Sequence, residues 1–403
     1  MIVRARTAVT MCGQPIEDAA VAISGRTISA VGKWNDLRGS NHNEVTDLGE
    51  CVLLPGLINA HCHLDYTCLR GSIPSPQSFT GWVREINDRK SALRLEDYIT
   101  SVGDGLAEAA AFGTTTVCNL EAFPELVAKV PPSLLRIWWF AEMLDLRQAV
   151  DPVDVYARMA AEVPSSRGGV GLAPHAPFTA SAQLYRAATA VAQRHGLPLT
   201  THLAESGEEM QMFRDGAGAL FEFLRGLGRP MADCGRRTPL QLLLEAGVLD
   251  ERWIVAHLNE LTRDDLRRLE SAPRFHVAHC PRSHAYFAHK PFALTELRQL
   301  GFNICLGTDS LASNNDLSLV AEMRQLSKVE PGLAPEELLE MATINPARAL
   351  GQHGTLGRIA PGYSADFIAI PAERSGNALL EEVLEFDGAV PWMMIAGEKV
   401  PAV

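Results

Sequence analysis

Two histidines close an apolar run near the start of the chain. They are His61 and His63, at the end of the stretch LLPGLINAHCH. In an extended strand, residues two positions apart point to the same side, so both imidazoles can face one point beyond the strand's end. Imidazole is the commonest protein ligand for divalent transition metals. The pair alone is a weak signal for a metal site, and its interpretation depends on the polar residues that the rest of the chain supplies.

Two further candidate ligands stand at the ends of later apolar runs. His202 ends the run PLTTH, and Asp309 follows NICLGT. The simpler interpretations are a buried histidine bonded to a backbone carbonyl and an aspartate that caps a helix. However, three neutral imidazoles leave the charge of a divalent ion uncompensated, and an inward carboxylate compensates it. Because three histidines, one aspartate and a position open to water describe a catalytic site, we predict one divalent metal ion per chain, held by His61, His63, His202 and Asp309.

Candidate proton carriers stand beside these ligands. A divalent ion lowers the pKa of a bound water, so that hydroxide is available near neutral pH, and Asp309 can accept the released proton. His257, at the end of WIVAH, would orient the hydroxide or stabilise charge in the tetrahedral adduct. Glu205 follows His202 by three residues; it would be a surface residue in the simplest interpretation, but low dielectric beside the metal would raise its pKa. Such a carboxyl group can protonate a ring nitrogen and help ammonia leave, as hydrolysis of an amidine C–NH2 bond requires.

Strand-like and helix-like patterns alternate through the middle of the chain. The predicted strands are Leu53–Ala60, Thr114–Leu120, Leu134–Glu142, Val170–Pro174, Pro198–His202, Trp253–His257, Arg274–His279 and Phe302–Thr308. The predicted helices between and after them include Ala182–Arg194, Glu208–Leu224, Arg263–Leu269, Leu294–Leu300, Asn315–Ser327 and Pro335–Met341. About eight such units close a parallel barrel, whose active site lies at the carboxyl ends of the strands. The candidate residues stand at those ends, with His175 after the fourth run, so we expect them to converge.

The two ends of the chain have a different character. Ala20–Ile23 and Thr27–Val31, separated by SGR, predict a hairpin with glycine in its turn. Strands are too few there for an independent core, and residues 357–370 and 393–400 show a similar turn-then-strand pattern. We predict one small β-sandwich made of both termini, residues 1–54 and 355–403, and a barrel domain over residues 55–354.

Composition argues against several classes of function. The chain has 403 residues, 47% of them hydrophobic, and a formal net charge of −12 without any basic cluster. Nucleic acid and anionic membranes are not expected as partners, since phosphate contacts need clustered lysine and arginine. No apolar run is long enough to span a membrane, the N-terminus lacks the apolar core of a signal peptide, and the eight cysteines form no CxxC pair. We expect a cytoplasmic protein with reduced cysteines that acts on a small molecule.

Several segments carry a family resemblance. In chain order they are PGLINAHCHLD, APHAPFTAS, THLAES, IVAHLNEL, HCPRSHAYF, LGTDSLASNNDLSL, NPARALG and GRIAPGYSADF. Together they resemble the amidohydrolase superfamily, in its cytosine-deaminase-like branch, over nearly the whole chain. The resemblance implies an α/β fold, namely a (β/α)8 TIM barrel with a small β-sandwich, and a homodimer. It also implies the four metal ligands named above, with Glu205, His257 and Asp309 as proton carriers.

The resemblance also bears on the number of metal ions. Members of the superfamily with two metals use a carbamylated lysine at the end of the fourth strand. The third and fourth predicted strands, RIWWFAEM and VGLAPH, contain no lysine. A single ion is therefore expected, with zinc as the first choice and iron as the alternative.

The substrate is expected to be an adenine nucleoside. Similar enzymes deaminate S-adenosylhomocysteine, methylthioadenosine, adenosine and aminodeoxyfutalosine, and His175 resembles the histidine that they place near the ribose or its 5′ substituent. Trp82, in the loop after the first strand, is preceded by Gly81, where adenosine-type enzymes carry glutamate. This run looks more like the aminodeoxyfutalosine deaminases, so we expect a bulky 5′ substituent, bound by Trp82 and His175. His284 replaces the usual asparagine of the branch, and its role and that of His279 are left open.

Other functions fit parts of the same pattern. Within the enzyme class, the site could serve a guanine-type deaminase or an s-triazine amino- or chlorohydrolase. From another class, the chain could be a catalytically silent barrel that binds a ligand. The presence of both Glu205 and His257 counts against a silent barrel, since binding alone needs neither.

Overall fold

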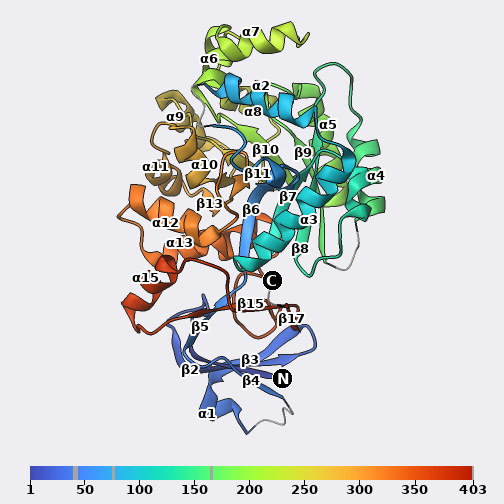
Figure 1. The fold of residues 1–403 in the computed structure, drawn as a ribbon. Coiled ribbons are helices and arrows are strands. Elements are labelled where there is room, and N and C mark those ends of the chain that lie inside the picture. Colours follow the sequence, from blue (N-terminus) through green and yellow to red (C-terminus); the bar gives the residue numbers. More distant parts are fainter. Residues whose placement is uncertain (40–43, 75–77, 164–166, 402–403) are drawn as a thin grey trace.

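A sheet of nine parallel strands forms the centre of the molecule, and helices surround it (Figure 1). The computed structural model describes residues 1–39, 44–74, 78–163 and 167–401. The strands follow the order β13-β12-β11-β10-β9-β8-β7-β6-β14, and all neighbours are parallel. Their bounds are β6 Leu57–His63, β7 Thr114–Glu121, β8 Arg136–Met143, β9 Gly168–Pro174, β10 Leu199–Leu203, β11 Trp253–His257, β12 His276–His279, β13 Asn303–Leu306 and β14 Asp309–Ser310.

The sheet curls until its first and last strands meet. Gly307 and Thr308 join β13 to β14. The amide of Gly307 donates to the carbonyl of His279 in β12 (2.9 Å), and the amide of Thr308 donates to the carbonyl of His61 in β6 (3.1 Å). A Cβ at Gly307 would lie 2.7 Å from that His61 oxygen, so glycine is needed for the close approach. The prediction of an α/β fold built on a parallel sheet is confirmed.

Helices follow most of the strands and begin and end at expected capping residues. For example, the side chain of Ser181 accepts a hydrogen bond from the Leu184 amide at the start of α5, and Gly196 ends the helix with φ 67°. No helix among the described residues has the length and apolarity needed to cross a membrane. The helices around the parallel sheet are α2 Phe79–Lys90, α3 Leu95–Ala111, α4 Pro152–Glu162, α5 Ala182–His195, α6 Gly207–Asp215, α7 Ala219–Gly226, α8 Pro239–Ala246, α9 Arg263–Ser271, α10 Pro281–Tyr286, α11 Leu294–Gln299, α12 Leu319–Val329, α13 Pro335–Ala342 and α14 Ile344–Ala349.

The single helix predicted over Glu208–Leu224 is wrong. The chain forms α6 and α7 there, because Gly216 (φ 64°) and Gly218 (φ 104°) adopt backbone conformations that stop a right-handed helix. The helix predicted to begin at Asn315 starts only at Leu319. The side chain of Ser318 caps it by accepting a hydrogen bond from the Ala321 amide.

The run predicted as one strand, Leu53–Ala60, contributes to two sheets. Its first part lies in β5 (Cys51–Pro55) of a second sheet, and its second part lies in β6 of the parallel sheet. Gly56 stands between them, where a Cβ would lie 2.2 Å from the side chain of Thr115. The strand is therefore interrupted at Gly56, where the chain crosses from one sheet to the other, although the sequence is hydrophobic on both sides.

The second sheet contains strands from both ends of the chain. Its order is β17-β16-β15-β5-β1-β2-β3, with β4 also paired to β1. The predicted hairpin is confirmed as β2 and β3, and β5 pairs antiparallel with β15, with Leu53 opposite Ala369. One face of this sheet holds a cluster of buried side chains that includes Val21 and Phe367. The bounds are β1 Ile2–Ala8, β2 Ile16–Ser24, β3 Thr27–Lys33, β4 Val45–Asp47, β15 Phe367–Pro371, β16 Trp392–Ile395 and β17 Glu398–Lys399.

A buried ion pair joins the two sheets. Arg136, the first residue of β8, donates from Nε to Oδ2 of Asp366, just before β15, at 2.8 Å. Only 13% of the arginine side chain and 7% of the aspartate side chain are exposed. Oδ1 of Asp366 also accepts a hydrogen bond from the Ala396 amide (2.6 Å), so the carboxylate connects β8 with the C-terminal strands.

We expect Arg136→Ala to lower the free energy of unfolding by about 3–5 kcal/mol, because it leaves the Asp366 carboxylate buried without its cation. Chemical denaturation followed by circular dichroism measures the change. The matched control is Arg158→Ala, which breaks an ion pair with Asp154 whose side chains are 56% and 66% exposed. That variant should lose about 0.5 kcal/mol or less. Equal losses in the two variants would contradict a special role of the buried pair.

Candidate active site

Four histidines and an aspartate converge at the carboxyl ends of β6, β10 and β11 and at the start of β14, which follows β13. His63 Nε2 lies 3.1 Å from His202 Nε2, while Asp309 Oδ1 lies 3.8 Å from His61 Nε2 and 4.0 Å from His63 Nε2. Two overlapping groups could each hold a metal ion: His61 with His63 and His202, and His61 with His257 and Asp309. Within each group the potential ligand atoms lie within 4.8 Å of one another. The structure thus brings the four predicted ligands and His257 together.

The protonation of these imidazoles suits a metal ion. Nδ1 of His202 donates to the carbonyl oxygen of His175 (2.9 Å), so its Nε2 presents a lone pair to the cluster. Neither ring nitrogen of the buried His61 has a hydrogen-bond partner among the described residues. Burial and the nearby His202 lower the pKa of His61 to about 3, and burial also lowers the pKa of His202 to about 4. Both rings are therefore neutral at pH 7, which is the form that binds a divalent cation.

The backbone turns sharply where the site residues stand. His257 (φ 71°), Asp309 (φ 57°) and Ala204 (φ 50°) have positive φ, which non-glycine residues seldom adopt. His257 ends β11, Asp309 follows β13, and Ala204 follows β10. Such strain persists only where surrounding structure enforces it, and it is common at functional sites.

Serine hydroxyls hold the carboxylate of Asp309. Ser283 Oγ donates to Asp309 Oδ2 at 2.6 Å, and Ser283 Oγ lies 3.0 Å from Ser313 Oγ. The other oxygen, Oδ1, is the one that lies near the histidines. The two carboxylate oxygens therefore have different surroundings, one bonded to hydroxyl groups and one facing the cluster.

Glu205 lies beside His257, with Oε1 3.7 Å from Nε2 of the imidazole. Burial raises the pKa of Glu205 well above its ordinary value, and the negative charges of Asp309 and Glu209 raise it further. Glu209 Oε2 also accepts a hydrogen bond from the backbone amide of Glu205 (2.8 Å), which fixes this loop after β10. A carboxyl group with a raised pKa can carry a proton at neutral pH, as the predicted acid–base role requires.

A cavity of about 600 Å³ opens beside this cluster. His63, His202, Glu205 and Asp309 lie at one end. Its outer wall is mostly apolar and comes from α2 and α7. The wall residues include Phe79, Trp82, Leu220, Phe223 and Leu224. A concave apolar space with a few convergent polar groups is the usual form of a small-molecule site.

The two predicted substrate-binding residues both line this cavity. Trp82 is not in a loop, as its sequence suggested, but in α2, whose start is fixed by the carboxylate of Glu208 bonded to the Phe79 amide (2.9 Å). Its ring packs edge-on against Phe287, with centroids 5.1 Å apart. His175 follows β9, and its Nδ1 lies 2.6 Å from Thr179 Oγ1.

Three functional candidates were not predicted from the sequence: Glu142, Glu209 and Ser283. Glu142 stands near the end of β8 and lines the cavity, with Oε1 4.0 Å from His175 Nε2. The rule that singled out the histidines, a polar residue at the carboxyl end of an apolar run, applies equally to RIWWFAEM and would have found it. Glu209 and Ser283 act through contacts with distant or neighbouring loops, and the sequence gives no comparable signal for them.

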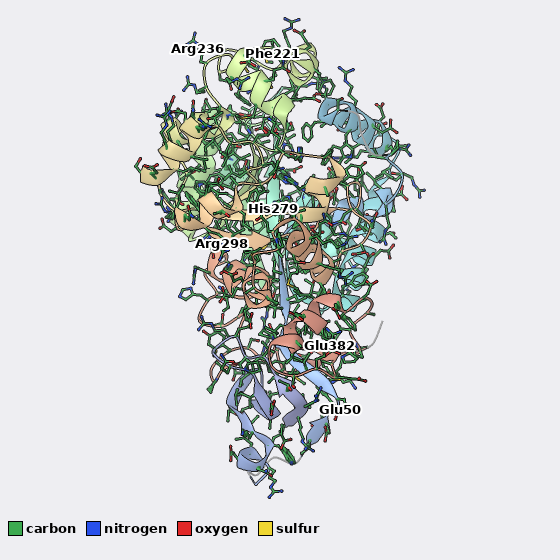
Figure 2. All side chains as sticks on the ribbon, turned by 90° about the vertical axis from the view of Figure 1, so that its left-hand side faces the viewer. Glu50, Phe221, Arg236, His279, Arg298 and Glu382 are labelled. Atoms are coloured by element: carbon green, nitrogen blue, oxygen red, sulfur yellow. The ribbon has the colours of Figure 1, made fainter. Side chains whose placement is uncertain are left out.

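His279 and His284 belong to a separate cluster and do not line the cavity. The ring of His279 stacks on Phe292 with centroids 4.0 Å apart, and it lies 5.3 Å from the ring of His284, which in turn neighbours His289. Figure 2 shows His279 in the middle of the molecule, with Phe221 of α7 towards one end and Glu50, just before β5, towards the other. The structure thus gives His279 a packing role.

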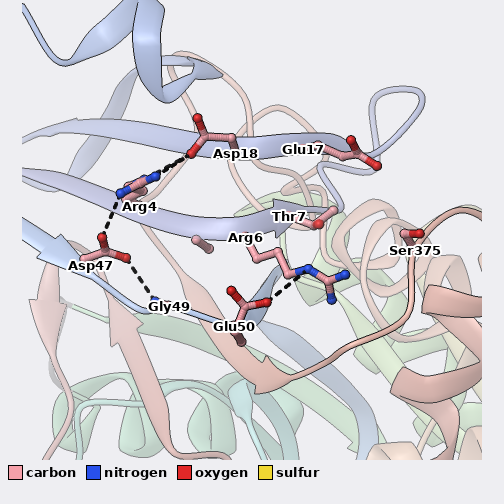
Figure 3. Close-up of a pocket in the computed structure, with 10 residues that line it drawn as sticks. Arg4, Arg6, Thr7, Glu17, Asp18, Asp47, Gly49, Glu50 and Ser375 are labelled. Atoms are coloured by element: carbon pink, nitrogen blue, oxygen red, sulfur yellow. Dashed lines mark hydrogen bonds and ion pairs between the residues drawn. The ribbon is translucent and has the colours of Figure 1, made fainter.

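A second cavity, of about 540 Å³, lies on the second sheet far from the histidines (Figure 3). Its two arginines pair with acidic residues of the same cavity: Arg4 with Asp18 (2.9 Å) and Asp47 (3.0 Å), and Arg6 with Glu50 (3.2 Å). No metal-binding group of histidine, cysteine or acidic residues was found there among the described residues. Both metal-binding groups found among the described residues include residues of the first cavity.

Comparison with known sequences identifies relatives. The sequence profile of the Amidohydrolase family matches residues 52–400. The 5-methylthioadenosine/S-adenosylhomocysteine deaminase of Pyrococcus furiosus is 32% identical over 374 residues, which cover 89% of this chain and 82% of that protein. The predicted resemblance to the amidohydrolase superfamily is confirmed.

Comparison with solved structures shows the same fold. Aminofutalosine deaminase of Helicobacter pylori, in complex with methylthio-coformycin, matches with a TM-score of 0.88 and 21% identity, over 99% of this chain and 100% of that chain. An adenosine deaminase of Xanthomonas campestris with bound zinc matches with a TM-score of 0.82 and 24% identity, over 99% and 92%. These likenesses show a shared fold, and the histidine cluster of this chain supports a divalent metal ion.

We expect His202→Ala to lose the metal ion, because it removes an imidazole whose lone pair faces the cluster. Elemental analysis of the purified wild type should give about one metal ion per chain, as expected for a site of three imidazoles, one carboxylate and a water. His195→Ala, which removes an exposed histidine at the end of α5, is the control and should keep the ion. Two ions per chain, both needed for activity, would show that the single-ion prediction is wrong.

Proposed function

The chain belongs to the amidohydrolase family, and we propose that it deaminates an adenine nucleoside with a bulky 5′ substituent, as aminodeoxyfutalosine, methylthioadenosine and S-adenosylhomocysteine have. The prediction of a hydrolase that acts on C–N bonds is confirmed by the family and by relatives named as deaminases. One observation carries the choice of substrate class: the cluster of ionisable residues opens directly into a cavity of about 600 Å³ with an apolar outer wall. A nucleoside fits this polarity, with its base at the cluster and its 5′ substituent at the wall.

We propose that His61, His63, His202 and Asp309 hold the metal ion. A divalent ion there lowers the pKa of water and so supplies a nucleophile near neutral pH. The unpartnered, buried nitrogens of His61 and the neutral imidazoles around it are the observations that favour this assignment. Zinc is the proposed ion, since the structure of the Xanthomonas campestris adenosine deaminase contains zinc.

The residues around the ion provide the proton transfers. Asp309 accepts the proton of the attacking water, while Glu205, protonated because of its raised pKa, donates to the ring nitrogen next to the attacked carbon. His257, 3.7 Å from Glu205, stabilises charge on the oxygen that has been added. A second proton transfer to the amino group then allows ammonia to leave, and the carbon becomes a carbonyl.

The outer wall determines which substrates bind well. Trp82 and Phe223 offer flat apolar surfaces, and Leu220 and Leu224 of α7 extend them. His175 supplies a hydrogen-bonding group between this wall and the cluster. A free base such as guanine would leave the wall unfilled, whereas a nucleoside with an alkylthio or aryl-bearing 5′ group buries apolar area against it.

We also propose the organisation of the whole molecule. Residues 55–354 would form a (β/α)8 barrel, and residues 1–54 and 355–403 a small β-sandwich. The bonds from Gly307 and Thr308 to β12 and β6 favour a closed barrel, and the pairing of β5 with β15 favours a unit made of both termini. The cytoplasmic location and the homodimer remain predictions; the former agrees with eight cysteines that are all free.

We expect Glu205→Gln to reduce kcat by a factor of about 10² to 10⁴, because the amide keeps the size of the side chain but cannot transfer a proton. Metal content should be unchanged, which separates loss of chemistry from loss of the site. Glu270→Gln, on the exposed surface of α9, is the matched control and should retain full activity. Near-normal turnover of the Glu205 variant would contradict its role as proton carrier.

We expect kcat/KM to be highest for adenine nucleosides with a bulky 5′ group, with aminodeoxyfutalosine first. The panel should include methylthioadenosine, S-adenosylhomocysteine, adenosine, guanine, cytosine and an s-triazine, with ammonia release as the measurement. Filling the apolar wall should favour the substituted nucleosides over adenosine by about 10-fold or more, the usual effect of a few apolar groups. If a free base or a triazine is the best substrate, the nucleoside assignment is wrong.

A further inference from the structure

Glu142 is a carboxylate in the cavity wall to which no described residue donates a hydrogen bond. Its side chain is only 9% exposed, and within the described part of the chain no hydrogen bond reaches it. Two other carboxylates near the cavity have donors: Glu208 accepts from the amides of Phe79 and Thr80, and Asp145 accepts from Ser181. An acidic group that is largely withdrawn from water and lacks donors is unfavourable, unless a ligand supplies them.

The position of Glu142 relates it to one part of a bound nucleoside. The ring of His175 lies 4.7 Å from the ring of His202 in the histidine cluster, and its Nε2 lies 4.0 Å from Glu142 Oε1. Glu142 therefore lies in the cavity wall beside His175, the histidine that neighbours the cluster. With the adenine at the cluster and the 5′ group at the apolar wall, the sugar occupies the space between them.

Lys90 of α2 lines the same cavity and affects the same carboxylate. Its ammonium group donates to the hydroxyl of Tyr66, and its positive charge opposes the effect of burial on the pKa of Glu142. Burial raises the pKa of Glu142, and the charge of Lys90 offsets part of this rise. The ionised form that Lys90 favours has two oxygens that can accept hydrogen bonds.

We propose that Glu142 binds the vicinal 2′- and 3′-hydroxyl groups of the substrate's ribose; this inference depends on the proposed function. Each carboxylate oxygen accepts one O–H group, and hydrogen bonds to an ionised acceptor are stronger than neutral ones. Such a pair also fixes the sugar, so that the base is held at one orientation relative to Glu205. Nucleosides without the diol would leave the carboxylate buried without a donor, and so bind poorly.

The test compares Glu142→Gln with the wild type on 5′-methylthioadenosine and on its 2′,3′-dideoxy form. The wild type should prefer the diol by about 10- to 100-fold in kcat/KM, as expected for hydrogen bonds to a charged group. The variant should lose most of this preference, mainly through KM for the diol, and treat the dideoxy form as the wild type does. Glu85→Gln, which removes an exposed carboxylate of α2 outside the cavity, should change neither value.

The possible results are distinct. An equal loss on both substrates would overturn the inference and leave Glu142 a general electrostatic role, while the deaminase function would stand. A loss confined to S-adenosylhomocysteine, whose 5′ group carries an ammonium, would also overturn it and assign Glu142 to a cation. If the wild type deaminates no nucleoside, the function and the inference fail together. The variant and the wild type should give matching melting curves, which excludes a folding defect. Inhibition constants for the inosine product with and without the diol measure binding of the diol independently of turnover.

Discussion

Asp309 reaches His61 because the last parallel strand passes within hydrogen-bonding distance of the first. The amide of Thr308 donates to the carbonyl of His61, and Gly307 leaves room for the two backbones to approach. Without this junction, the carboxylate and the histidines would stand at opposite edges of an open sheet. The positive φ of Asp309, directly after the junction, then turns its side chain towards the cluster and its second oxygen towards Ser283.

Burial explains why so many ionisable groups can share this small space. Desolvation is the largest influence on the pKa of His61, His202 and Glu205, and in each case it favours the neutral form. Neutral imidazoles repel one another little and keep their lone pairs for a cation, and a neutral carboxyl group keeps a proton to donate. One physical effect therefore keeps the metal ligands unprotonated and the acid protonated, and it follows from burying them at the carboxyl ends of the parallel strands.

The sequence predicted well those features that depend on short-range periodicity. His61 and His63 share a side because strands repeat every two residues, and the other ligands were found because each ends an apolar run. The split of β5 from β6 was missed, since hydrophobicity does not show that Gly56 passes closely by Thr115. The break between α6 and α7 was also missed, although Gly216 and Gly218 offered a signal. Contacts such as Ser283 with Asp309 join residues far apart in the chain, and no local pattern encodes them.

The antiparallel pairing of β5 with β15 has a consequence for biosynthesis. Strand β5 is synthesised soon after its neighbour β1, but its other neighbour, β15, follows only after the whole parallel sheet has been made. Until then β5 presents an open edge that could pair with another chain, a known cause of aggregation. The nascent chain can assemble its parallel sheet during this interval, whereas the second sheet can be completed only once β15 has been made. A chain that terminates before Phe367 would keep this edge of β5 open permanently. Pairing with β15 therefore protects the folded protein against edge-to-edge association.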